Sequence, residues 1–190
     1  MTPFARLAAR AVVLEGRNVD TDQIIPARFL RKPRSAGYEA FLFADVPAMR
    51  AVVMGAGVVF AGENFGCGSS REGAVYALVD AGVRCVVAPS FGDIFAGNAG
   101  KNGLLLLTLG DGETALMRAA VGSGGEVVVD LPAQRIAGPG GAVLEFEIEP
   151  FRKRMLLEGL DDIGMTLAHG EALEAWRQRD AVVRPWALPC

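Results

Sequence analysis

The order of apolar runs and glycine-rich breaks along the chain predicts alternating strands and helices. Short, mostly apolar runs that predict strands occupy 11–15, 58–61, 84–88 and 104–109, and the second and third, which contain β-branched residues, are typical of buried strands. The segment 71–81, between the second and third runs, has the pattern of a helix. A strand, a helix and another strand in this order form a βαβ unit, so we expect these strands to pair in parallel.

The second half of the chain predicts a different pairing. A helix is expected at 111–121, where a run of glycines follows it. The segments 126–131 and 142–149 resemble a β-hairpin-type pair, with proline and glycine in the connection. In the second segment, leucine, phenylalanine and isoleucine alternate with glutamates, which predicts one buried face and one wet face.

Polar and helix-like segments complete the predicted domain, which we expect to span residues 1–190 as one unit. Pro26 restricts the preceding residue to extended geometry, so 16–26 is expected to be a loop and not a helix. The basic segment 31–37 contains proline and glycine and is expected to be a mobile loop. The part from 150 to 180 is helix-like, and 181–190 resembles a tail that needs a partner surface to be ordered.

Composition and charge exclude several classes of function. The chain has 190 residues, with 51% hydrophobic and 22% charged residues, which is typical of a globular domain. Its formal net charge is −3, which argues against nucleic-acid binding through bulk positive charge. Three cysteines without a CxxC pair favour reduced thiols in the cytosol and cannot build a four-cysteine cluster from this chain alone.

The sequence also predicts a soluble, cytoplasmic protein. The longest nearly apolar stretch, 51–62, is too short and too rich in glycine for a membrane span, which needs about 20 residues. The N-terminal segment, 1–16, is interrupted by charged residues and does not resemble a targeting sequence.

The segment 62–72, with the sequence GENFGCGSSRE, is the strongest candidate for a functional site. It lies between a predicted strand and a predicted helix. Gly66 and Gly68 permit positive φ angles, so backbone N–H groups can converge in this loop. Ser69 or Ser70 is a favourable N-cap for the helix.

The end of this segment predicts a pocket for an anionic group. Ser69 and Glu72 fit a capping box, and the first amides of a helix attract anions. Arg71 adds a guanidinium fork suited to a carboxylate. The segment is neither a P-loop nor a hydrolase nucleophile elbow, because the required residues are in the wrong order. In the alternative interpretation, the two serines only cap the helix.

Four separated motifs carry a resemblance to a known family. They are NVDTDQIIPARFL (18–30), GENFGCGSSRE (62–72), APSFGDIFAGNAGKNGLL (88–105) and GLDDIGMTL (159–167). Together they resemble the small subunit of 3-isopropylmalate dehydratase, in the aconitase superfamily. The resemblance implies a swivelling β/β/α domain of the α/β class, in which helices flank a mixed sheet.

The same resemblance implies a composite active site. No metal or cofactor is expected in this chain, and a [4Fe–4S] cluster is expected on a separate large subunit, in a heterodimer or heterotetramer. The family reaction isomerises 2-isopropylmalate to 3-isopropylmalate by dehydration and rehydration, in leucine biosynthesis. By resemblance, Ser69 is the catalytic base, acting as an alkoxide, while Ser70 and Arg71 bind a substrate carboxylate.

Asp22 and Arg31 are further candidates for substrate binding. Asp22 is expected to support Arg71 or to position Ser69, and its alternative role is to anchor an Asx turn. Arg31 and Arg34 lie where the family has its substrate-selecting loop, although both can instead be solvated loop charges.

The chain departs from the family pattern at Gly73, where the family usually has histidine. Glycine in the first turns of a helix costs up to about 1 kcal/mol relative to alanine, and this one removes a polar ring beside the loop. The departure leaves two alternatives open. One is a related dehydratase for another dicarboxylate, of homoaconitate or methylmalate/citraconate type. The other is a non-catalytic binding module of the same fold.

Overall fold

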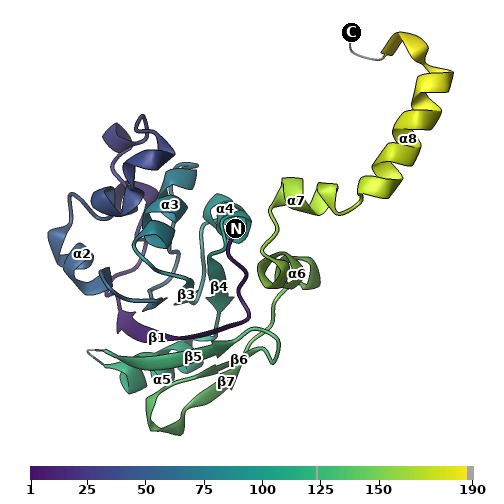
Figure 1. Cartoon of the computed structure of the whole chain (residues 1–190). Helices are drawn as coiled ribbons and strands as arrows, with labels where there is room; N and C mark the ends of the chain where they lie inside the picture. The colour runs from purple at the N-terminus through teal and green to yellow at the C-terminus, as the bar shows by residue number, and fades with distance from the viewer. Residues whose placement is uncertain (123, 188–190) are drawn as a thin grey trace.

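A seven-stranded mixed sheet forms the centre of the protein. The computed structural model describes residues 1–122 and 124–187. The strand order is β4-β3-β2-β1-β5-β6-β7 (Figure 1). The strands are β1 (Arg6–Val13), β2 (Val58–Phe60), β3 (Cys85–Ala88), β4 (Leu105–Thr108), β5 (Gly125–Asp130), β6 (Arg135–Ala137) and β7 (Val143–Glu145). The pairs among β1, β2, β3 and β4 are parallel and the remaining pairs are antiparallel, so the predicted α/β class with a mixed sheet is confirmed.

Eight α-helices occur in the described part of the chain. They are α1 (Thr21–Ile24), α2 (Pro47–Val53), α3 (Glu72–Asp80), α4 (Asp93–Lys101), α5 (Asp111–Val121), α6 (Pro150–Glu158), α7 (Asp162–Leu167) and α8 (Gly170–Val183). α3 connects β2 to β3, which confirms the predicted βαβ unit. Short 3₁₀ turns occupy Ala27–Phe29, Arg34–Ala36, Tyr38–Phe41, Pro139–Gly141 and Pro185–Ala187.

The sheet separates two apolar cores, because successive strand residues point to opposite faces. On one face, Val59 and Val86 pack with side chains of the segment from α1 to α4, such as Leu78. On the other face, Val58 packs with apolar residues of α5, α6 and the antiparallel strands, such as Met117. The helices that carry the candidate site residues therefore all lie on the first face.

The antiparallel part of the sheet differs from the prediction. The segments 126–131 and 142–149 do not pair with each other, because β6 lies between them and pairs with both β5 and β7. β6 has only three residues, too few for a recognisable alternation pattern. β1 begins at Arg6 and not at 11, because the residues from Arg6 to Ala11 pair with β5. The sequence did not indicate this extension, since the residues before Ala11 include two arginines and are exposed or only partly buried. The predicted alternation around Phe146 is confirmed, since its neighbours Glu145 and Glu147 are exposed.

Two segments expected to be loops contain short helical turns. Thr21–Ile24 forms the single turn of α1, where the Asp20 carboxylate accepts a hydrogen bond from the Gln23 N–H at 2.8 Å. The prediction of no helix in 16–26 is therefore wrong for these four residues, although Ile25 is extended as predicted. In the basic loop, Arg34–Ala36 forms a 3₁₀ turn.

The C-terminal part is helical, as predicted. α7 and α8 project from the body of the protein as an arm (Figure 1). The predicted tail is wrong at its start, since α8 continues to Val183 before the turn Pro185–Ala187, and the remaining residues lie outside the described part. In the part that the structure describes, none of the helices has the length and apolar character needed to cross a bilayer.

Candidate active site

Backbone contacts from two distant segments hold the loop between β2 and α3. The N–H of Gly66 donates to the carbonyl of Val19 at 2.8 Å, and the N–H of Thr21 donates to the carbonyl of Cys67 at 2.9 Å. On the other side, Phe65 forms a parallel bridge with Phe91. The loop is thereby fixed between the DTD motif and the segment that precedes α4.

Glycine is required at the two predicted positions of this loop. Gly66 and Gly68 have φ angles of 74° and 90°, a region that side chains strongly disfavour. A Cβ atom on Gly66 would lie 2.3 Å from Cγ of the Phe95 ring. The loop therefore turns sharply and packs closely on α4, which confirms the predicted positive φ.

Ser69 and Ser70 are exposed, and neither caps the helix. α3 begins at Glu72, and its N-cap is Arg71, whose side chain makes no capping hydrogen bond. The prediction of a serine N-cap is wrong, as is the capping box from Ser69 to Glu72. The reason is the extended backbone of Arg71 (φ −133°, ψ 97°), which delays the start of the helix by one residue relative to the nearer serine. Both hydroxyl groups therefore remain available to a ligand.

The backbone around the serines offers unused donors. The N–H groups of Ser69, Ser70 and Arg71 make no hydrogen bond to any residue that the structure describes. They lie directly before the N-terminus of α3, where the helix dipole is positive. This arrangement favours an anion beside the serine hydroxyls.

Arg71 and Asp22 form an ion pair beside this loop. Arg71 Nη1 contacts Asp22 Oδ1, with 12% of the arginine side chain and 56% of the aspartate side chain exposed. Nη1 is buried and makes no well-directed hydrogen bond within the described residues. The predicted proximity of Asp22 and Arg71 is thus confirmed, and the local cap of α1 is formed by Asp20 instead. The arginine fork keeps donors for a carboxylate.

Thr21 is a site residue that the sequence analysis missed. Its buried side chain donates a hydrogen bond from Oγ1 to the carbonyl oxygen of Ser69 at 2.9 Å. The same residue binds the loop through its backbone N–H at Cys67. The only signal was its place between two aspartates in the DTD motif, which indicated a polar turn without showing a long-range contact.

Comparisons with known proteins identify the family of this chain. The family model "Aconitase C-terminal domain" matches residues 54–112, and the model LeuD_N matches 114–150. The chain is 44% identical to the 3-isopropylmalate dehydratase small subunit of Rhodospirillum centenum, over 99% of this chain and 100% of that one. It is 45% identical to the same subunit of Phenylobacterium zucineum, over 98% of each.

The chain belongs to the 3-isopropylmalate dehydratase small-subunit family. A solved structure of 3-isopropylmalate dehydratase (leuD) from Methanocaldococcus jannaschii shares its fold, with a TM-score of 0.70 and 30% sequence identity. The likeness covers 90% of this chain and 99% of that one. The expected aconitase-like domain is thereby confirmed.

The two arginines that the resemblance suggested for substrate selection, Arg31 and Arg34, have different environments. Arg31 is exposed and pairs with no residue in the described part of the chain. Arg34 forms an ion pair with Asp80 and stacks on the Tyr76 ring, with its guanidinium carbon 4.5 Å from the ring centroid. The hydrogen bond from Arg34 to Asp80 raises the pKa of the guanidinium. Arg34 therefore holds its loop against α3, and only Arg31 remains available to a substrate.

Close packing leaves little room for a side chain at position 73, where the resemblance led us to expect a histidine. Gly73 is buried in the first turn of α3, where a Cβ would lie 2.8 Å from Leu30 Cδ2 and 3.2 Å from Tyr38 Cε1. Any larger side chain at this position would require Leu30 to move and would press on the Tyr38 ring. Glycine allows Leu30, next to Arg31, to pack directly on the start of the helix that follows the serines.

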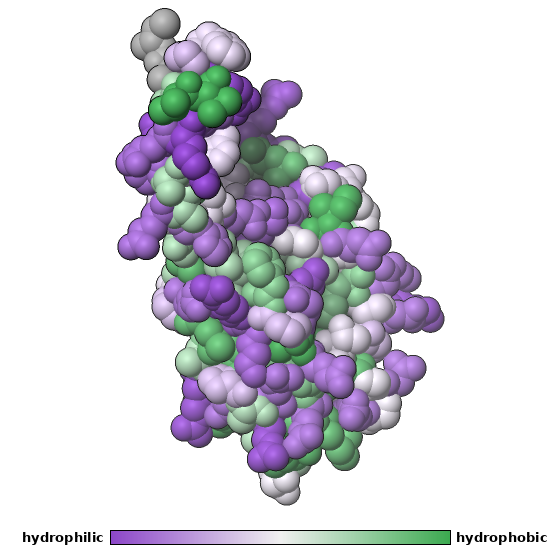
Figure 2. All heavy atoms as spheres, turned by 90° about the vertical axis from the view of Figure 1, so that its right-hand side faces the viewer, coloured by the Kyte–Doolittle hydropathy of each residue, from purple (hydrophilic) through white to green (hydrophobic). Residues whose placement is uncertain are grey.

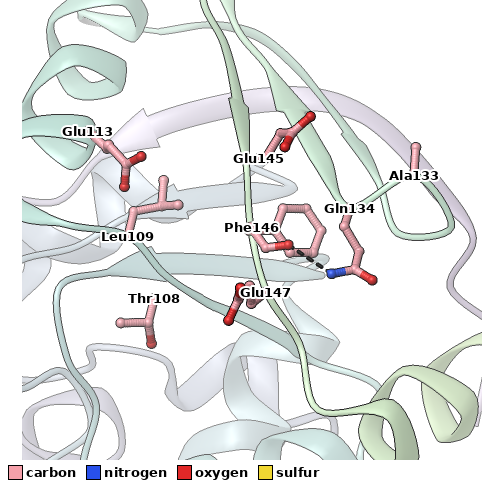
Figure 3. A pocket seen from close by; sticks show the side chains of 8 residues that line it. All are labelled: Thr108, Leu109, Glu113, Ala133, Gln134, Glu145, Phe146 and Glu147. Atoms are coloured by element: carbon pink, nitrogen blue, oxygen red, sulfur yellow. Dashed lines mark hydrogen bonds between the residues drawn. The ribbon is translucent and has the colours of Figure 1, made fainter.

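A cavity elsewhere in the protein is lined by none of the predicted site residues. It has a volume of about 740 Å³. Its lining consists of Thr108, Leu109, Glu113, Ala133, Gln134, Glu145, Phe146 and Glu147 (Figure 3). Two of its three glutamates have structural partners, since Glu113 accepts from the Gly110 N–H and Glu145 pairs with Arg135. These contacts explain most of the acidic lining without a ligand.

Metal ligands do not converge in the described residues. No group of three or more His, Cys, Asp or Glu side chains in 1–122 and 124–187 is arranged to hold a metal ion. Cys67 and Cys85 are free thiols, and burial raises the pKa of the Cys85 thiol. The side chains around Ser69 therefore do not fit an iron–sulfur cluster bound to this chain.

Proposed function

We propose that this chain is the small subunit of a hydro-lyase that isomerises 2-isopropylmalate to 3-isopropylmalate in leucine biosynthesis. A large subunit that carries a [4Fe–4S] cluster completes the enzyme, which works in the cytoplasm as a heterodimer or heterotetramer. One observation carries the proposal. The exposed Ser69 lies beside three free amides and the Arg71–Asp22 pair, in a chain that matches named small subunits over nearly its full length.

Ser69 is the base in this proposal. Its Oγ, as an alkoxide, takes the proton from the substrate carbon next to the one that carries the hydroxyl, and returns it during rehydration. A serine hydroxyl is too weak an acid to ionise unaided at neutral pH, so the site has to stabilise the anion. Unpaired amides and the positive end of α3 supply fixed dipoles that need no reorganisation during the reaction.

Arg71 and Ser70 bind a carboxylate of the substrate. A guanidinium donates two parallel hydrogen bonds to a carboxylate, which fixes the orientation of the acid as well as its position. The ion pair with Asp22 holds the guanidinium beside the serine loop. Ser70 lies next to Arg71 and is exposed, so its hydroxyl can donate to the same carboxylate.

The partner supplies the chemistry that this chain lacks. The cluster of the large subunit provides a Lewis acid for the departing hydroxyl group when it is bound there. This chain contributes the base, the carboxylate site and the loop between α1 and α2 that faces the substrate's side chain. The free thiols Cys67 and Cys85 suit a reducing compartment.

The unpaired Arg31 favours a second candidate substrate class. An exposed cation at this place suits an acid with an extra carboxylate, of homoaconitate type, whereas the neighbouring Leu30 suits an alkyl group. Both side chains belong to the segment that packs against Gly73. The ratio of kcat/KM for a homocitrate-type acid to kcat/KM for 2-isopropylmalate therefore tests whether Arg31 or Leu30 faces the substrate.

Reconstitution with the cognate large subunit under anaerobic conditions tests the proposed function. The assay compares 2-isopropylmalate, citraconate and a homocitrate-type acid as substrates. The proposal predicts the highest kcat/KM with 2-isopropylmalate. A higher kcat/KM with one of the other acids would assign the chain to the related dehydratase. A stable complex without turnover of any of the three would instead indicate a non-catalytic module.

A further inference from the structure

The arm formed by α7 and α8 exposes an unusual number of large apolar side chains. The exposed fractions are 68% for Ile163, 66% for Leu167 and 51% for Trp176, and Val182, Val183 and Trp186 are also exposed. Every residue of α8 is at least partly exposed. Figure 2 looks onto the side from which the arm projects and shows hydrophobic residues between hydrophilic ones along it.

A helix in this position needs a packing partner. α8 has 14 residues, and isolated helices of about this length are only marginally stable in water. Most helices gain their stability by burying an apolar face against another element. The exposed apolar residues of α8 share the helix with exposed charges, here Glu171, Glu174 and Arg177, and such a mixture of apolar and polar surface is typical of a protein interface.

Contacts along α4 connect this arm to the candidate active site. Glu72, the first residue of α3, accepts a hydrogen bond from Asn102 Nδ2 at 2.8 Å. The adjacent Lys101, at the end of α4, forms an ion pair with Asp162 at 2.7 Å. Asp162 is the first residue of α7 and directly precedes Ile163. The exposed apolar residues therefore begin beside the same end of α4 that contacts the start of the helix behind Ser69.

We propose that the apolar side chains of α7 and α8 form a docking surface for the large subunit, continuous with the active site. The inference rests on the proposed function, because it takes its partner from there. A protein that closes the site over Ser69 has to cover the N-terminal end of α3 and the adjoining end of α4. Beyond this end of α4, the surface of the partner protein would contact Ile163 and Leu167. A second copy of this chain is the competing occupant.

Binding measurements on the full-length chain test this surface without reference to turnover. The test variant is Ile163→Ser with Leu167→Ser and Trp176→Ser. The matched control is Leu116→Ser with Val143→Ser, because Leu116 and Val143 are each 55% exposed and lie on α5 and β7. All these residues are exposed, so we expect both variants to unfold within a few degrees of the parent chain. Far-UV circular dichroism shows whether α8 itself persists.

The surface assignment predicts that the test variant binds the large subunit at least about tenfold more weakly, while the control binds as the parent chain does. At saturating large subunit, the kcat of the test variant should match that of the parent. Unchanged affinity of the test variant for the large subunit would overturn the inference. It would also be overturned if the test variant lost only its self-association and still bound the large subunit as the parent chain does. If the parent pair binds tightly but does not convert 2-isopropylmalate, the proposed function fails, whereas weaker binding by the test variant still supports the surface.

Discussion

Asp22 and Arg71, which are distant in the sequence, form an ion pair in the folded protein. Asp22 belongs to the single turn of α1, and Arg71 immediately precedes α3. The guanidinium is mostly buried while the carboxylate is half exposed, so the aspartate holds a cation that lies directly after the two serines in sequence. This pair links the DTD motif to the GSSRE motif, which the sequence alone places far apart.

Replacing Asp22 by asparagine tests whether this pair positions the arginine. Asn retains the size of the side chain and loses the charge, so the guanidinium should be held less firmly and bind the substrate carboxylate less well. We expect Asp22→Asn to raise KM about fivefold, as for the loss of a partly exposed ion pair. Steady-state kinetics of the reconstituted pair measure the effect.

Asp45→Asn is the matched control, because Asp45 forms an exposed ion pair with Arg28 outside the serine loop. Its KM should equal that of the parent chain. A lower KM in Asp22→Asn would contradict the account, because it would mean that Asp22 competes with the substrate for Arg71.

The contact between Gly66 and Phe95 predicts a large loss of stability on adding a single methyl group. Gly66→Ala places a Cβ 2.3 Å from the ring at a φ of 74°, so both the backbone and the ring have to shift. We expect the free energy of unfolding to fall by about 3 kcal/mol, measured by urea denaturation.

Gly97→Ala in α4 is the corresponding control. A Cβ on Gly97 would lie within 4 Å of no described atom beyond its chain neighbours and the backbone of its own helix, and alanine favours a helix. This variant should gain about 0.5–1 kcal/mol. Equal stability of Gly66→Ala and the parent chain would show that the loop has another conformation available.

Asp80 predicts a pH dependence of stability. Burial alone would raise the pKa of Asp80, but hydrogen bonds from Arg34 and from the Tyr38 N–H outweigh it and hold the pKa below its usual range. The stability from this lowered pKa is therefore present above the unfolded carboxyl pKa of about 4 and is lost as the pH falls through the folded value.

Asp80→Asn should consequently be about 1 kcal/mol less stable than the parent at pH 7, since Arg34 is partly exposed. The difference should shrink as the pH falls from 5 to 2, roughly across the titration range of a lowered carboxyl pKa. Urea denaturation at several pH values measures it. A difference that stays constant over this range would mean that Asp80 acts through packing and not through its charge.

Local patterns predicted the parallel strands and the glycine turn, because both depend on residues next to each other in sequence. The start of α3, the stability of α4 and the environment of Arg34 depend on the folded structure, and the sequence did not show them. The start of α3 depends on the extended Arg71, so serines that look like caps remain free. Two interior glycines weaken the helical pattern of α4, which is stabilised by packing through Phe95. Arg34 and Arg31 are alike in sequence, and the positions of Asp80 and Tyr76 on α3 distinguish them.

The most direct test of the central claim is the kcat of Ser69→Ala in the reconstituted complex. The Ser69 side chain is exposed, so its removal should leave both the fold and the affinity for the large subunit unchanged. With the affinity confirmed, we predict that kcat with 2-isopropylmalate falls by about 10³-fold or more, as expected for loss of the proton-transfer group. A kcat within tenfold of the parent value would contradict the assignment of Ser69 as the base.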